Sequence, residues 1–126
     1  MGSLSMLEAQ VQAARGLGQA ICAALSGEAR KLGFAGTELE LPEFDGARYS
    51  LQRDPASGRD SLVCDWTDAR GQRRGQMLFH ADGSFWAEYD VVRPHPGDGR
   101  WFVEAVTAWG RDNMIRTEPR LLPMLG

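Results

Sequence analysis

The chain has 126 residues, a formal charge of −3 and an apolar fraction of 43%. This length is typical of a single domain, which we predict over residues 6–126. The composition excludes collagen, a disordered chain and a disulfide scaffold. No apolar run approaches the roughly 20 residues of a membrane span, so no membrane partner is expected. We interpret residues 1–5 (MGSLS) as the remnant of an expression vector.

The acidic residues outnumber the basic ones by 17 to 14. Proteins that bind nucleic acid usually carry a basic surface, so nucleic acid is not an expected partner. Cys22 and Cys64 each stand beside apolar neighbours. Free cysteine is among the most buried residue types. Two cysteines allow only one disulfide, which is few for an exported protein stabilised by disulfides. We therefore expect two reduced core cysteines in a cytoplasmic protein.

The first long segment, residues 6–32, has the apolar spacing of a helix. Apolar side chains recur there at steps of three and four, which predicts one buried stripe. Gly18 lies on that stripe, which indicates close approach of another backbone. Gly33 follows basic residues and predicts a left-handed cap. The pair Ser26-Gly27 marks a place where the helix could break in two.

Beyond residue 36 the apolar period changes to two, which is typical of strands. Short turn-forming segments separate the alternating runs, and Asp82-Gly83 is a strong hairpin signal. These features predict an antiparallel meander with one packed face and one wetter face. The expected strands cover residues 37–41, 47–53, 61–67, 72–80, 85–93 and 114–118.

Residues 101–109 fit two structures. Trp101, Phe102, Ala105, Val106 and Trp109 share one helical stripe, whereas β-branched and aromatic content favours a strand. A strand would mix polar and apolar residues on both faces, so we predict a second helix near 99–109. The predicted fold is thus α+β, with an N-terminal helix packed on a five- or six-stranded antiparallel meander.

Titratable residues gather in one part of the chain. The group consists of His80, Asp82, Glu88, Asp90 and His95, and it includes two imidazoles, which zinc or iron sites use. The spacing matches no recognised metal motif, so we predict no metal and no cofactor. Glu88, Asp90 and Glu104 could supply an acid–base pair, but 17 acidic residues make chance neighbours common. We predict no catalytic residue, and the chain shows no nucleophile elbow or phosphate loop.

Trp86 is the most informative single residue. On the expected strand 85–93 it shares a face with Glu88 and Asp90, where a polar residue was expected. An exposed tryptophan among polar residues often marks a binding surface. The alternative is that the C-terminal segment covers it. We select Trp86 with five neighbours as candidate binding residues, namely Glu88, Asp90, His80, Trp101 and Glu104.

The segment 76–92 contains D-G-S-F-x-x-E-Y-D, which resembles the hairpin of some small bacterial immunity proteins. The resemblance implies an acidic, single-domain, helix-plus-meander protein. Together with the small size and the missing catalytic motifs, it favours a non-enzymatic protein-interaction module of the immunity-protein or effector-chaperone type.

Two alternatives stay open from the sequence. One is a small-ligand-binding protein or small enzyme, with a pocket between sheet and helix lined by Trp66, Trp86, Trp101, His80 and Glu104. The other is a homodimer formed through an open sheet edge.

Overall fold

The computed structural model describes residues 5–36, 39 and 41–124. Within these residues the chain forms a helix, a short 3-10 helix and a six-stranded sheet. The expected strand at 37–41 lies largely outside the described residues. The elements are α1 (Met6–Leu32), η1 (Phe44–Gly46), β1 (Arg48–Arg53), β2 (Asp60–Thr67), β3 (Arg73–Phe79), β4 (Ser84–Pro94), β5 (Trp101–Arg111) and β6 (Met114–Pro123).

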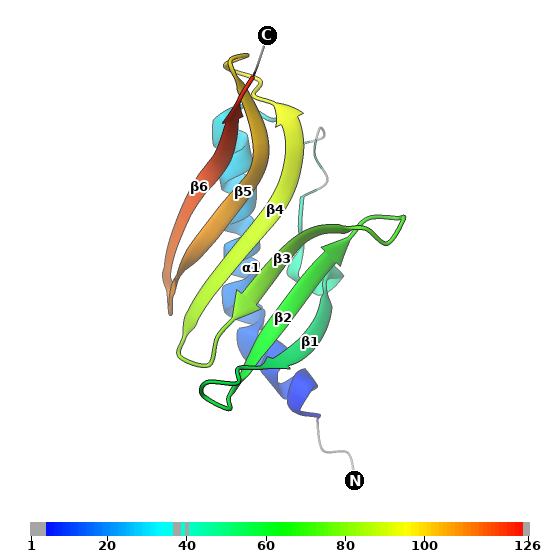
Figure 1. Ribbon diagram of the computed structural model, residues 1–126, viewed down its shortest axis with the longest axis vertical. Helices are drawn as coiled ribbons and strands as arrows, with labels where there is room; N and C mark the ends of the chain where they lie inside the picture. The colour runs from blue at the N-terminus through cyan, green and yellow to red at the C-terminus, as the bar shows by residue number, and fades with distance from the viewer. Residues whose placement is uncertain (1–4, 37–38, 40, 125–126) are drawn as a thin grey trace.

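The strands follow one another across the sheet in chain order, and every neighbouring pair is antiparallel. Figure 1 looks onto one face of this sheet, with α1 crossing behind the other face. The predicted α+β fold, a helix packed on an antiparallel meander, is therefore confirmed. No helix in the described part of the chain has both the length and the apolar character needed to cross a membrane.

Both ends of α1 are capped, and the cap at Gly33 is the one that the sequence predicts. The Ser5 hydroxyl accepts a hydrogen bond from the Glu8 backbone N–H at 3.1 Å, and Gly33 adopts a left-handed conformation with φ 107°. The possible break at Ser26-Gly27 does not occur, because α1 continues unbroken to Leu32. Near its end, the buried Glu28 carboxylate accepts a hydrogen bond from the Thr117 hydroxyl at 2.9 Å, which ties the helix to β6.

The predicted second helix near 99–109 is wrong, since Trp101–Arg111 forms strand β5. The strand contains a β-bulge. In the pairing with β6, Val103 and Ala105 face consecutive residues of the partner strand, so Glu104 is an extra residue. A bulge places two consecutive residues opposite one and locally disturbs the ladder.

The bulge explains why β5 has the apolar spacing of a helix. Val103, Val106 and Ala108 all belong to the core, so the buried positions are separated first by three residues and then by two. A regular strand would separate them by two throughout. Simple alternation therefore fails for this strand, and the residues left on the other side of the sheet are Glu104, Ala105, Thr107 and Trp109.

The core lies between α1 and the covered face of the sheet. Cys22 of α1 and Cys64 of β2 are both buried and reduced, as expected. Burial raises the pKa of each thiol to about 12. The thiolate is the nucleophilic form of cysteine. Neither side chain is therefore suited to nucleophilic catalysis near neutral pH.

The close neighbour that leaves room only for glycine at position 18 is a side chain, whereas the sequence indicated a backbone. A β-carbon at this position would lie 2.2 Å from Cδ1 of the buried Phe44 ring. We expect Gly18→Ala to lower the free energy of unfolding by about 1–3 kcal/mol, because the rigid ring cannot shift without strain. Urea denaturation monitored by circular dichroism measures this loss.

Gly16 provides the matched control on the same helix. It is exposed, and a β-carbon there would meet no atom within 4 Å. Gly16→Ala should therefore raise the free energy of unfolding by up to about 1 kcal/mol through helix propensity alone. Equal effects of the two substitutions would contradict the packing assigned to Phe44.

Candidate functional site: the open face of the sheet

An apolar row crosses the sheet face that α1 leaves uncovered. Val63, Leu78, Trp86 and Trp109 are direct neighbours on four successive strands, because each is paired in register with the next. Val63 is buried, and the other three side chains are half-buried. Side chains directly opposite each other on neighbouring strands are in contact range. We call these four residues the tryptophan row.

A polar row runs beside the tryptophan row, two residues away from it on each strand. Its members on the first strands are linked by a hydrogen bond of 2.9 Å from the Gln76 side-chain amide to the Asp65 carboxylate. On the last strands the row places two carboxylates on either side of the small, buried Thr107. In register order the polar row contains Arg48, Asp65, Gln76, Glu88, Thr107 and Glu118.

Arg120 of β6 reaches across β5 and joins carboxylates of two other strands. Its guanidinium lies 2.6 Å from Glu88 of β4 and 3.2 Å from Glu104 of β5. The bulge makes the second contact possible, since it brings Glu104 to the open face. Asp90 stands next to this group, and burial first and the Glu88 charge second raise its pKa above the ordinary value.

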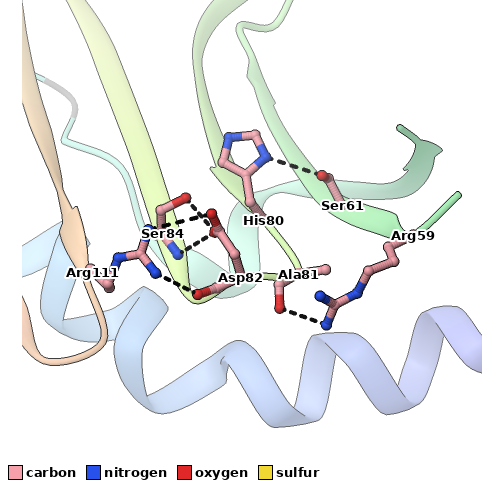
Figure 2. A network of polar contacts seen from close by, with 7 residues as sticks. All are labelled: Arg59, Ser61, His80, Ala81, Asp82, Ser84 and Arg111. Atoms are coloured by element: carbon pink, nitrogen blue, oxygen red, sulfur yellow. Dashed lines mark hydrogen bonds and ion pairs between the residues drawn. The ribbon is translucent and has the colours of Figure 1, made fainter. Parts of the chain in front are cut away.

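The opposite side of the tryptophan row is bordered by a polar network at the turns of the hairpins (Figure 2). The Ser61 hydroxyl and Nδ1 of His80 are 3.1 Å apart, which links β2 to the end of β3. Arg59 donates to the Ala81 carbonyl at 3.1 Å, and Arg111 donates to the Asp82 carbonyl at 3.0 Å. The network therefore holds the three hairpin turns at this end of the sheet together.

Ser61 and His80 are the residue types of a nucleophile and its base, and they lie within hydrogen-bond distance. The carboxylates that could orient the imidazole are held elsewhere. Asp54 accepts hydrogen bonds from Ala56 and Ser57 in its own turn, and Asp82 accepts them from Ser84. The contact between Ser61 and His80 therefore links two turns, and neither Asp54 nor Asp82 completes a catalytic triad with them.

The structure brings together four of the six candidate binding residues named from the sequence. Trp86, Glu88, Asp90 and Glu104 all lie on the open face, on β4 and β5. The other two lie apart from them. His80 belongs to the network at the turns, and Trp101 is at the far end of β5, opposite Pro123.

The pocket predicted between sheet and helix does not form, because the five residues expected to line it lie in different parts of the structure. Trp66 is buried on the covered face, where its indole N–H donates to the Glu43 carbonyl at 2.8 Å. Trp86 and Glu104 lie on the opposite face of the sheet. The ligand-pocket alternative therefore loses the set of residues on which it was based.

The two histidines lie at opposite ends of β4, an 11-residue strand that spans roughly 35 Å. His95 accepts hydrogen bonds at Nδ1 from the backbone N–H groups of Gly97 and Asp98. Among the described residues there is no group of three or more histidine, cysteine or acidic side chains that could hold a metal ion.

Trp109 and Arg120 belong to the site, and sequence reasoning did not select either. Trp109 was assigned to a helix, so its place opposite Trp86 could not be seen. Arg120 lay beyond the last expected strand, which ended at residue 118, although β6 continues to Pro123. The available signal was the alternation of charged with uncharged residues in the sequence from 115 to 121.

An open hollow of about 480 Å³ lies beside the two tryptophans of the site, towards the edge strand β6. It is lined by Trp86, Thr107 and Trp109 and by residues 118–121 of β6. A comparison of the chain with protein-family models, curated proteins and solved structures found no match.

The raised pKa of Asp90 predicts a pH-dependent cost to stability. A carboxyl group with a raised folded-state pKa weakens the fold as the pH rises through that pKa. Asp90→Asn is therefore expected to raise the urea midpoint at pH 7. The gain should vanish below about pH 3.9, where the wild-type carboxyl is protonated in both states.

Asp98 is the matched comparison with the opposite sign. The Arg100 side chain lowers the pKa of Asp98 to about 2 by hydrogen bonding. Asp98→Asn should lower the urea midpoint at pH 7, and this loss should fade as the pH falls from about 4 towards 2. A lower midpoint for Asp90→Asn at pH 7 would contradict the environment described for Asp90.

Proposed function

We propose that the protein is a non-enzymatic interaction module that binds another protein through the open face of its sheet. The observation that carries the proposal is the tryptophan row, an apolar strip in the middle of a face that no other described element covers. Polar residues border the strip on both sides. An apolar centre with a polar rim and aromatic anchors is the usual anatomy of a protein–protein interface.

The size of the open face also supports a protein partner. Six strands spaced about 4.8 Å apart, with about eight residues each at 3.3 Å, present roughly 750 Å². A standard interface buries about 800 Å² on each partner. The hollow beside Trp86 is open and most of its lining side chains are only half-buried, whereas small-ligand sites usually enclose most of the ligand.

Within this function we favour a cytoplasmic module of the immunity-protein or effector-chaperone type. The support is the acidic charge of −3, the small single-domain fold and the hairpin around Asp82-Gly83 that resembles immunity proteins. Two reduced, buried cysteines fit a reducing compartment.

Trp86 should be the energetic centre of the interface. Tagged wild-type protein and Trp86→Ala would be used to capture partners from a lysate of the source organism, with quantification by mass spectrometry. We expect one protein to be enriched by the wild type and reduced about thirtyfold or more by Trp86→Ala, because central aromatic anchors contribute about 2 kcal/mol or more.

Trp101→Ala is the control, since Trp101 is exposed at the far end of β5. It should retain the partner, and circular dichroism should show both variants folded. A partner that binds Trp86→Ala as well as wild type, or the absence of any enriched partner, would refute binding through this face.

A further inference from the structure

The open face contains a trough that follows β5. Thr107 and Ala105 form its floor, because both are small and buried while their cross-strand neighbours are long. Trp109 stands at one end of this floor, and Glu104 stands at the other. We call this feature the β5 trough, and its walls are Glu88 and Asp90 of β4 and Glu118 and Arg120 of β6.

Negative charge dominates the trough. Four carboxylates line it, from Glu88, Asp90, Glu104 and Glu118. Two guanidiniums stand against them, that of Arg120 in the wall and that of Arg116, which is paired with Trp109 at the end of the trough. Arg120 is already engaged by two of these carboxylates, at 2.6 and 3.2 Å. Within the described part of the chain, the side chains of Asp90 and Glu118 form no salt bridge.

The way Arg120 is held shows which group suits this trough. Its planar guanidinium bridges carboxylates of neighbouring strands, a geometry that a single ammonium group matches less well. The two indoles next to the hollow add a second attraction, because the faces of tryptophan rings attract guanidinium groups. Carboxylate and indole together therefore favour arginine as the group that enters.

The same charges disfavour other occupants of the face. A second copy would bring a chain of charge −3 against a trough that is itself acidic. Phosphate-bearing ligands such as nucleic acid or anionic lipid would meet the same repulsion. Opposed like charges at an interface weaken association, whereas complementary charges speed it.

We infer that the partner of the open face docks a basic segment along the β5 trough and inserts an arginine between the Trp86–Trp109 pair and Glu118. This inference rests on the proposed function and names the chemistry of the partner. Apolar side chains of the same segment would lie on the tryptophan row. The arginine would supply the counter-charge that Glu118 lacks in the free protein.

The test uses a blocked synthetic peptide in which arginine alternates with leucine, and NMR spectra of the ¹⁵N-labelled full chain. We expect the indole N–H signals of Trp86 and Trp109 to shift on titration. Affinity should fall with added salt, and about tenfold or more in Glu118→Gln, since hydrogen bonds to charged groups contribute about that factor.

Asp112→Asn is the matched control for charge. It removes one carboxylate from the turn between β5 and β6, where φ is 55° and asparagine is well tolerated. This variant should bind the peptide like wild type. Equal weakening by Asp112→Asn and Glu118→Gln, or peptide shifts located away from the trough, would overturn the inference.

Three further outcomes separate this inference from the proposed function. If a peptide with glutamine in place of arginine binds the same face equally well, the preference for arginine is overturned while the proposed protein-binding face stands. If sedimentation shows a dimer that Trp86→Ala abolishes, the occupant is a second copy and the basic partner is overturned. If no peptide shifts either indole, the basic segment is rejected, and the partner capture with Trp86→Ala still judges the proposed function independently.

Discussion

A single helix can cover only one face of a six-stranded sheet, and most features of this protein follow from that constraint. The covered face holds the core, where α1 contributes Ile21 and Leu25 and the strands contribute Leu62 and Met77. The other face is in contact with water and carries the second set of alternating side chains. Over most of its area these are charged and amide groups, as is common in antiparallel sheets. The tryptophan row departs from this pattern along one line across the sheet, and Pro94, Phe102 and Leu122 form a second apolar group at the other end of β4, β5 and β6.

The bulge in β5 determines what that open face contains. Without an extra residue, strict alternation would place Glu104 and Val106 on one side and Val103 and Ala105 on the other. With it, both valines reach the core and Glu104 reaches Arg120. A bulge also lies in the pairing of β4 with β5, between Asp90 and Arg93, where Val92 is exposed and left-handed with φ 53°. A β-branched residue in this conformation is strained, so the surrounding strands must hold it there.

The sequence was sufficient to predict those parts of the fold that depend on local periodicity and turn chemistry. The helix 6–32, its cap at Gly33 and the strands on either side of Asp82-Gly83 all follow from such signals. The predictions were wrong at 99–109, because a bulge changes the phase of a strand by one residue and so imitates helical spacing. The site was recovered in part for the same reason. Trp86, Glu88 and Asp90 alternate on one regular strand, whereas Trp109 and Arg120 depend on the register of β5 and β6.

Stability of the sheet alone is a weak explanation for the open-face aromatics. A cross-strand aromatic pair such as Trp86 with Trp109 contributes roughly 0.2–1 kcal/mol, and smaller β-formers could supply a similar amount. The cost is an apolar strip that invites association wherever the sheet meets another surface. Charged residues on both sides of the strip restrict which surfaces can approach, because an unmatched charge must be desolvated on contact. The combination therefore fits the proposed protein-binding face better than a role in stabilising the monomer, and the surplus of carboxylates around β5 would favour a basic partner.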